Sequence, residues 1–242
     1  MRVWDIHPGY LARQSLLGEH NEIHGLWTVV TESRRGYAQH PETLRWQEHL
    51  HALYIRHEHV VAEMGLRGYN HHSPLSCSAA DTGWPSLFLD RPAMQFARLK
   101  EKYADGRQGR LPLPRNCQEL WAQHKYSVMA RSQQLYRSLG PVVAKMSAPQ
   151  ELDQLAEQLV LALRLPVSHG SLVNALLHMW GYVNELGMAF DKTQVGEMAK
   201  ERPAHLLAAI THGAQQVPYL WSSTALSDLA VAAYSVETQN QD

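Results

Sequence analysis

The sequence contains only two cysteines, Cys77 and Cys117, among 242 residues. Two isolated cysteines exclude a disulfide framework and a four-thiolate metal site, and they favour a reducing, cytoplasmic compartment. No apolar run reaches the roughly 18 residues that a membrane span needs, and the first ten residues, MRVWDIHPGY, lack the apolar core of a signal peptide. The motifs GxSxG, GxGxxG and the P-loop are missing from the sequence, which leaves serine-hydrolase, dinucleotide and NTPase sites without support.

The sequence also has little net charge, because 22 Lys and Arg residues face 23 Asp and Glu residues. The charge is unevenly divided: residues 1–115 hold 14 basic and 12 acidic side chains, and residues 116–242 hold 8 and 11. The net charge therefore argues against a strongly basic nucleic-acid binder only when it is averaged over the whole chain. Histidine, in contrast, is abundant, since ten of the 15 histidines precede position 116.

The spacing of apolar residues is helical throughout, and no run favours a β-strand over a helix. We predict an all-α protein of two helical domains, 1–112 and 117–242, joined by a Gly/Pro/Arg-rich linker over Asp105–Asn116 in which the glycines add freedom. The predicted helices run over residues 10–30, 44–65 and 92–104 in the first half, and over 117–139, 149–165, 168–186, 191–201, 205–217 and 224–236 in the second.

Two histidines, His20 and His24, stand at i and i+4 on the first predicted helix and share a face that could bind a metal. Glu22 points about 200° away from His20, and the sequence identifies no third ligand. His71-His72 in a loop is a second weak metal signal. Ordinary helix histidines are the simpler interpretation, so we predict no metal and no cofactor, and we keep a metal-dependent enzyme as an alternative.

Three stretches of the first half, in this order, resemble the pyrimidine-dimer DNA glycosylases of the phage endonuclease V type and their bacterial relatives over residues 1–105. They are MRVWDIHPGYLARQSLLGEHNEIHGLW, RWQEHLHALYIRHEHVVAEMGLRGYN and FARLKEKYADG. The resemblance implies a helical glycosylase that is also an abasic-site lyase. Its nucleophile is the N-terminal amine, which attacks C1′ of the damaged nucleotide and forms a Schiff base while a helix glutamate assists.

Carried onto this chain, the resemblance implies that Met1 supplies the amine and Glu22 the carboxylate. An α-amine ordinarily has a pKa of about 7.7–8.0, so a useful fraction is neutral and nucleophilic at pH 7. Arg2, Arg98 and Lys102 are expected to hold phosphate, and Asn21 is expected at the DNA interface. The implied partner is damaged double-stranded DNA, reached by extruding a nucleotide. The implied location is then the cytoplasm, at the nucleoid of a bacterium.

The chain departs from the phage-type pattern beside the predicted glutamate. Asn21 and Gly25 stand where the phage-type enzymes have arginines, and Ser15 stands where they have a histidine. The departures weaken the assignment to one lesion more than they weaken the lyase chemistry. The surplus histidines would partly replace the missing cations, so we expect DNA affinity to rise between pH of about 7.5 and 6.

The second half resembles the YbgA-like helical domain of unknown function, in the stretches LWAQHKYSVMARSQQLYRSLG and LVNALLHMWGY. The resemblance supports a nucleic-acid context and a possible protein partner, without a mechanism. The polar candidates for a site are His124, Lys125, Arg131, Asn174 and His178. Asn174 and His178 could equally be an i, i+4 pair that packs helices.

The leading hypothesis is therefore a DNA glycosylase with lyase activity on pyrimidine dimers or a related lesion. A lesion-binding module that has lost catalysis and the metal-dependent enzyme remain as alternatives.

Overall fold

The structure is a computed structural model that describes residues 1–184 and 190–239. Over these residues the chain is helical and contains no strand, which confirms the all-α prediction. The contacts divide the chain into two compact units, Met1–Gly109 (unit 1) and Arg110–Asp242 (unit 2). Within the described part, no helix is both long and apolar enough to cross a membrane.

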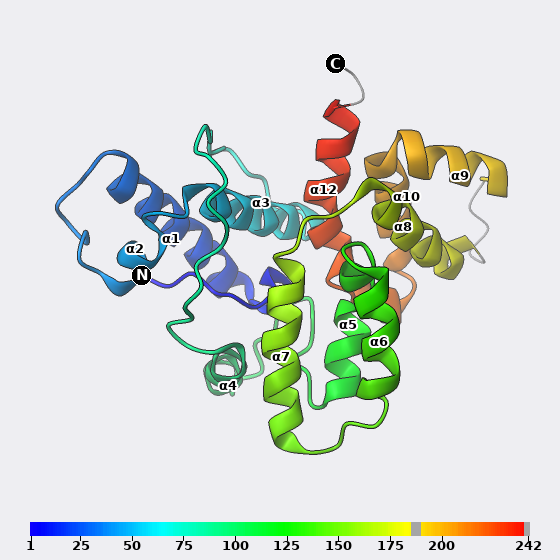
Figure 1. The fold of residues 1–242 in the computed structure, drawn as a ribbon, viewed down its shortest axis with the longest axis horizontal. Helices are drawn as coiled ribbons and strands as arrows, with labels where there is room; N and C mark the ends of the chain where they lie inside the picture. Colours follow the sequence, from blue (N-terminus) through cyan, green and yellow to red (C-terminus); the bar gives the residue numbers. More distant parts are fainter. Residues whose placement is uncertain (185–189, 240–242) are drawn as a thin grey trace. The chain divides into compact units, whose positions relative to one another are not determined.

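Unit 1 begins with an extended segment and then forms one short 3-10 helix and four α-helices (Figure 1). In chain order these are η1 (Pro8–Tyr10), α1 (Arg13–Thr31), α2 (Pro41–Trp46), α3 (Leu50–Leu66) and α4 (Pro92–Lys102). Helix α1 packs against α3 and α2, and its fully buried side chains include Leu16, Ile23 and Leu26. Residues 70–90 contain no helix, as predicted.

The predicted helix over 44–65 is wrong in its first part. Helix α2 starts earlier, because the His40 ring accepts a hydrogen bond from the backbone amide of Glu42 and Pro41 occupies the first turn. The helix ends at Trp46, whose indole donates to Glu42 and is 1% exposed. A turn then separates it from α3.

Unit 2 contains the remaining eight helices of the described chain. They are α5 (Cys117–Met129), α6 (Gln133–Val143), α7 (Pro149–Leu163), α8 (His169–Val183), α9 (Lys192–Glu201), α10 (Pro203–Ala214), α11 (Pro218–Trp221) and α12 (Ala225–Gln239). Helix α10 packs against α8 and α12, and α5 packs against α6 and α7. The predicted end of the 168–186 helix lies partly outside the described residues.

The single helix predicted over 117–139 is also wrong. Ser132 accepts a hydrogen bond from the backbone amide of Leu135, which caps a new helix and separates α5 from α6. Helix α6 then continues through Pro141 to Val143, past the predicted end.

The predicted linker is ordered by close packing. A Cβ added to Gly109 would overlap the backbone of Gly9 and Tyr10, so glycine is required there for close approach and adds no freedom. On the other side of the division, Leu111 is fully buried, and the Arg110 guanidinium donates to the carbonyl oxygens of Trp221 and Ser223.

Candidate functional site

The N-terminal segment is extended, so its backbone amides need acceptors from elsewhere in unit 1. Buried side chains provide them for residues 3–6. Glu42 Oε1 accepts from the amide of residue 3 at 3.1 Å, and Glu19 Oε1 accepts from that of residue 4 at 2.9 Å. Gln95 Oε1 accepts from the amides of residues 5 and 6 at 2.8 and 3.3 Å. Three helices therefore fix the path of the segment and the position of Met1.

A buried ion pair supports this arrangement. Arg56 on α3 donates to both carboxylate oxygens of Glu19 at 2.9 Å, and it also donates to the carbonyl oxygen of Ile6 at 3.0 Å. The Glu19 side chain is 0% exposed and that of Arg56 is 6% exposed. Burial raises the pKa of Glu42, the other carboxyl that holds the segment, despite the nearby Arg45 guanidinium. These polar groups were missed in the sequence, because their partners are far away along the chain.

The structure brings Met1 and Glu22 together. The amine nitrogen of Met1 lies 4.0 Å from Glu22 Oε2 and 3.5 Å from Nε2 of His40. Because Nδ1 of His40 accepts the capping hydrogen bond from Glu42, a neutral His40 carries its proton on Nε2 and presents a donor to the amine. A neutral amine can accept that hydrogen bond, whereas an ammonium group cannot. The amine therefore lies within reach of one carboxylate and one imidazole nitrogen.

Met1 and Glu22 lie at the wall of a cavity of about 670 Å³, a size typical of small-molecule sites. Gly25 belongs to its wall, and a Cβ at Gly25 would lie 3.9 Å from the Met1 sulfur, which is an ordinary van der Waals contact. The residues that line the cavity are Met1, Glu22, His24, Gly25, Thr28, Val29, Arg34, Gly36 and Tyr37.

The predicted phosphate ligands Arg2 and Arg98 meet at one carboxylate. Arg2 pairs with Asp90, and Arg98 on α4 donates to Asp90 at 3.0 and 3.1 Å. Burial would raise the pKa of Asp90, but the two guanidinium groups outweigh it and hold that pKa below its usual value. Lys102 is exposed on the same helix. Asn21 is exposed, and its side chain hydrogen-bonds the ring of His20.

Four histidines converge beside this cavity. His20 and His24 come from α1, His57 comes from α3, and His71 comes from the segment that follows α3. One ring nitrogen of each lies within 4.8 Å of one ring nitrogen of every other. The sequence drew attention to three of these residues and missed His57, which is fully buried and has no sequence motif.

The expectation that the histidines replace missing cations is wrong for three of them. Burial, followed by repulsion from neighbouring histidines, lowers the pKa of His20 to about 4. Burial and nearby histidines also lower the pKa values of His24 and His71. The His20 ring therefore stays neutral between pH 7.5 and 6, and the lowered pKa values make the rings of His24 and His71 harder to protonate than an ordinary histidine.

The polar residues that the sequence predicted as site candidates in unit 2 differ in their burial and in their partners. The Arg131 side chain is 4% exposed and donates to both oxygens of Asp228 at 2.7 and 3.0 Å, so its guanidinium joins the turn after α5 to α12. Nζ of Lys125 lies 4.7 Å from the ring centre of Tyr126 and 5.0 Å from that of Tyr219. Although burial would lower the pKa of Lys125, a hydrogen bond with Tyr219 raises it overall. The remaining candidates lie on two helices: His124 is buried on α5, and on α8 Asn174 is half-buried and His178 exposed.

We expect His124 to make unit 2 sensitive to acid. Burial lowers the pKa of His124 to about 4, whereas in the unfolded chain it is about 6.5. Between these values the unfolded state binds more protons, so the free energy of unfolding falls as the pH drops from 6.5 to 4, by up to about 3 kcal/mol. Urea denaturation at several pH values should show this fall for the wild type and a flatter profile for His124→Gln. Parallel profiles would contradict the prediction.

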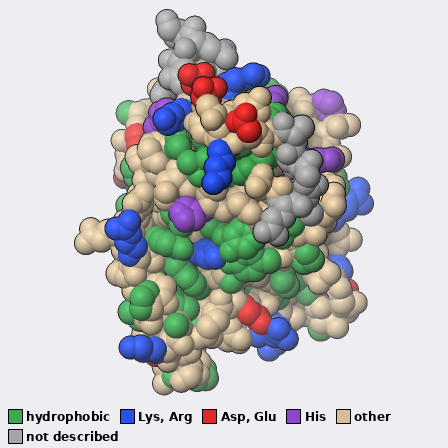
Figure 2. Space-filling view, turned by 90° about the vertical axis from the view of Figure 1, so that its right-hand side faces the viewer, with side chains coloured by type: hydrophobic (Ala, Val, Ile, Leu, Met, Phe, Trp, Pro, Cys, Tyr) green, Lys and Arg blue, Asp and Glu red, His purple; other side chains and the backbone are tan. Residues whose placement is uncertain are grey.

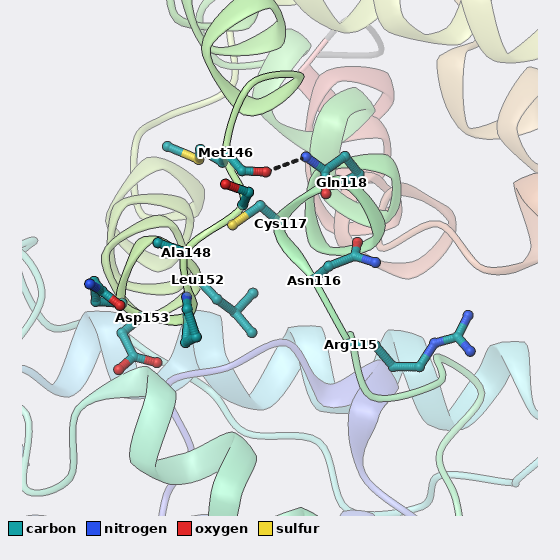
Figure 3. A pocket seen from close by; sticks show the side chains of 11 residues that line it. Arg115, Asn116, Cys117, Gln118, Met146, Ala148, Leu152 and Asp153 are labelled. Atoms are coloured by element: carbon teal, nitrogen blue, oxygen red, sulfur yellow. Dashed lines mark hydrogen bonds between the residues drawn. The ribbon is translucent and has the colours of Figure 1, made fainter.

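A second cavity, of about 560 Å³, lies in unit 2 around the start of α5 and α7 (Figure 3). Gln118 crosses its edge and donates to the carbonyl oxygen of Met146 at 2.8 Å. Burial raises the pKa of the Cys117 thiol, which keeps it protonated and poorly nucleophilic. Arg115 is paired with Glu119. The Cys117 thiol is therefore not an activated nucleophile for this cavity.

The surface is mixed in character on the face shown in Figure 2, where hydrophobic side chains gather between scattered basic and acidic ones. Exposed hydrophobic side chains of unit 2 include Leu161, Leu165, Tyr182, Tyr219 and Tyr234.

Comparison with known protein families gives two matches. Residues 1–76 match the family described as pyrimidine dimer DNA glycosylase, and residues 125–224 match a family described as a protein of unknown function, DUF1722. The two matches confirm the predicted fusion. The first includes Met1, Glu22 and all four clustered histidines, but it ends before α4, which carries Arg98 and Lys102. It supports a repair function of the pyrimidine-dimer glycosylase type. No curated protein and no solved structure matches the chain.

Proposed function

We propose, from the match of residues 1–76 to the pyrimidine dimer DNA glycosylase family, that unit 1 is a DNA glycosylase with abasic-site lyase activity. Its substrates are pyrimidine dimers or a related base lesion. The observation that carries this proposal is the position of the Met1 amine, 4.0 Å from the Glu22 carboxylate at the wall of a cavity.

In the proposed reaction, the neutral Met1 amine attacks C1′ of the damaged nucleotide. A C–N bond forms, the glycosidic bond breaks, and its electron pair leaves with the base. Loss of the amine proton and opening of the sugar ring give a Schiff base at C1′. Removal of a proton from C2′ then expels the 3′ phosphate by β-elimination, and water releases the enzyme by hydrolysing the Schiff base.

Glu22 has two roles in this scheme. Its carboxylate accepts the proton that the attacking amine loses, and its charge stabilises the cationic sugar and the protonated Schiff base. His40 is a positioning residue, because the Nε2 donor orients the electron pair of the amine. The buried acceptors Glu19, Glu42 and Gln95 hold the segment so that the amine meets C1′ at the cavity wall.

DNA binding is assigned to the polar groups next to Met1. Arg2 follows the nucleophile directly, Arg98 reaches the same carboxylate from α4, and Lys102 lies one turn further along that helix. Asn21 is exposed beside Glu22 on α1. Phosphates on either side of the lesion would contact these groups while an extruded nucleotide enters the cavity.

Asp90 is expected to limit DNA affinity, because it neutralises part of the charge of Arg2 and Arg98. Asp90→Asn should bind abasic-site DNA more tightly than the wild type. Arg98→Ala should bind it more weakly and should reduce the slope of log K against log salt by about 0.9, the loss of one phosphate contact. Fluorescence anisotropy at several salt concentrations measures both the affinity and the slope. Arg107→Ala is the control, because it removes one exposed cation that is paired with Asp105. Unchanged affinity in both test variants would contradict the assignment.

Borohydride trapping tests the proposed function. Intact-mass measurement first establishes that the purified chain starts at Met1 with a free amine. The protein is then incubated with duplexes that contain a pyrimidine dimer, an abasic site or no lesion, and borohydride reduces any Schiff base to a stable amine. We expect a covalent adduct with the damaged duplexes. No adduct with either would overturn the proposal, and tight binding without an adduct would favour the lesion-binding alternative.

A further inference from the structure

The four-histidine cluster is a group of electron-pair donors that the proposed DNA chemistry does not use. Nε2 of His24 lies 3.3 Å from Nε2 of His20 and 3.2 Å from Nε2 of His57. The corresponding edge of a zinc tetrahedron is about 3.3–3.4 Å, since Zn–N bonds measure about 2.0–2.1 Å. These two separations already match the spacing of ligands around one ion, and the four ligand atoms all lie within 4.8 Å of one another.

Within the cluster, several ring nitrogens have an electron pair but no hydrogen-bond donor to receive it. Nδ1 of His57 lies 2.8 Å from the Glu58 carboxylate, so a neutral His57 donates there and turns an unprotonated Nε2 toward His24. A single proton on Nε2 of His24 cannot be directed at both His57 and His20. Nε2 of His71 is buried and has no hydrogen-bond partner. A cation at the centre would satisfy all of these nitrogens.

The surroundings also suit a metal. His20 and His57 are buried, at 8% and 0% exposure, and His24 and His71 are half-buried. Burial lowers the pKa of His20 to about 4, so its ring is neutral and able to coordinate at neutral pH. The bond from His57 to Glu58 has the carboxylate–histidine arrangement that orients metal ligands in proteins.

We propose that His20, His24, His57 and His71 bind one Zn²⁺ ion in a structural site that joins α1, α3 and the segment after α3. Four protein nitrogens complete a tetrahedron and leave no position for water or substrate, which is the pattern of structural zinc sites. This proposal does not rest on the proposed lyase reaction. It goes beyond the sequence prediction, which assigned no metal.

Zinc titration of protein made without a histidine tag tests the site. The full chain is treated with EDTA, dialysed and titrated with ZnCl₂, and bound zinc is measured by elemental analysis. We expect one Zn²⁺ per chain and a rise in the melting temperature of unit 1 on the order of 10 °C with zinc well above its dissociation constant. Co²⁺ added in place of zinc should give the strong visible absorption of a tetrahedral nitrogen site.

Adjacent histidines provide a matched pair of variants. His71→Gln removes one ligand from a segment outside the helices, and His72→Gln changes an exposed neighbour outside the cluster. We expect His71→Gln to weaken zinc binding at least 100-fold and His72→Gln to leave it unchanged. Substoichiometric zinc in the wild type, or equal zinc affinity in the two variants, would overturn the proposal. The wild-type titration decides the matter even if a variant fails to fold.

Discussion

Blocking the Met1 amine should abolish the borohydride adduct, and Glu22→Gln should slow its formation by about 10²–10⁴-fold, the usual contribution of a positioned acid–base group. In the proposed reaction, the new bond to C1′ forms at the nitrogen of this amine. It can be blocked by acetylation or by adding residues before Met1. The amide that replaces the Glu22 carboxylate keeps the shape of the side chain but neither accepts a proton nor carries charge to balance the sugar cation.

Glu48→Gln is the matched control, since Glu48 is an exposed glutamate of unit 1 that does not line the cavity. We expect it to form adduct at the wild-type rate. Both glutamine variants should unfold at the same urea concentration as the wild type, because Glu22 and Glu48 are partly or fully exposed. An adduct that forms at an unchanged rate in Glu22→Gln, or in protein with a blocked amine, would contradict the assigned roles.

The sequence predicted the pair that we propose to react, because a resemblance placed Met1 and Glu22 in register. It could not predict what fixes them in place. Glu19, Glu42 and Gln95 each bond a backbone amide that is between 15 and 90 positions away along the chain. No local spacing encodes such contacts, because an extended segment can take its acceptors from any element that packs against it.

The helix boundaries show the same limit at shorter range. Periodicity identified the helical regions, but it did not identify His40 and Ser132 as capping residues that start new helices. Serine and histidine also occur inside helices, and only the local backbone decides whether the side chain caps an amide. A pattern of apolar residues therefore predicts that a helix exists more reliably than it predicts where the helix ends.

The histidine count was misleading for a related reason. Composition indicates how many rings can be protonated, whereas burial decides which of them are. His20 is nearly enclosed and has three other histidine rings beside it, and both burial and those neighbours make a proton on its ring less favourable. The cluster is consequently better suited to a metal ion than to DNA phosphates.

The buried pair of Glu19 and Arg56 should contribute strongly to the stability of unit 1. Burial raises the pKa of Glu19 to about 7 despite the Arg56 guanidinium, so the pair is fully ionised only above that pH. There Glu19→Gln leaves the Arg56 charge buried without a counter-ion, and we expect the free energy of unfolding to fall by about 3–5 kcal/mol. The surface pair Glu32–Arg34 is the matched control, because both side chains are more than half exposed. Glu32→Gln should cost less than about 1 kcal/mol. Urea denaturation of the full chain, followed by tryptophan fluorescence, measures both.

A double variant separates the buried charge from the lost hydrogen bonds. Glu19→Leu with Arg56→Met removes both charges and should be more stable than Glu19→Gln alone, because no unpaired ion remains. It should stay below the wild type by about 1–3 kcal/mol, since the amide of Trp4 loses its acceptor. The same loss frees the N-terminal segment, so the double variant should form the borohydride adduct more slowly although Met1 and Glu22 are intact. A folded double variant with wild-type adduct formation would show that the segment does not position the amine.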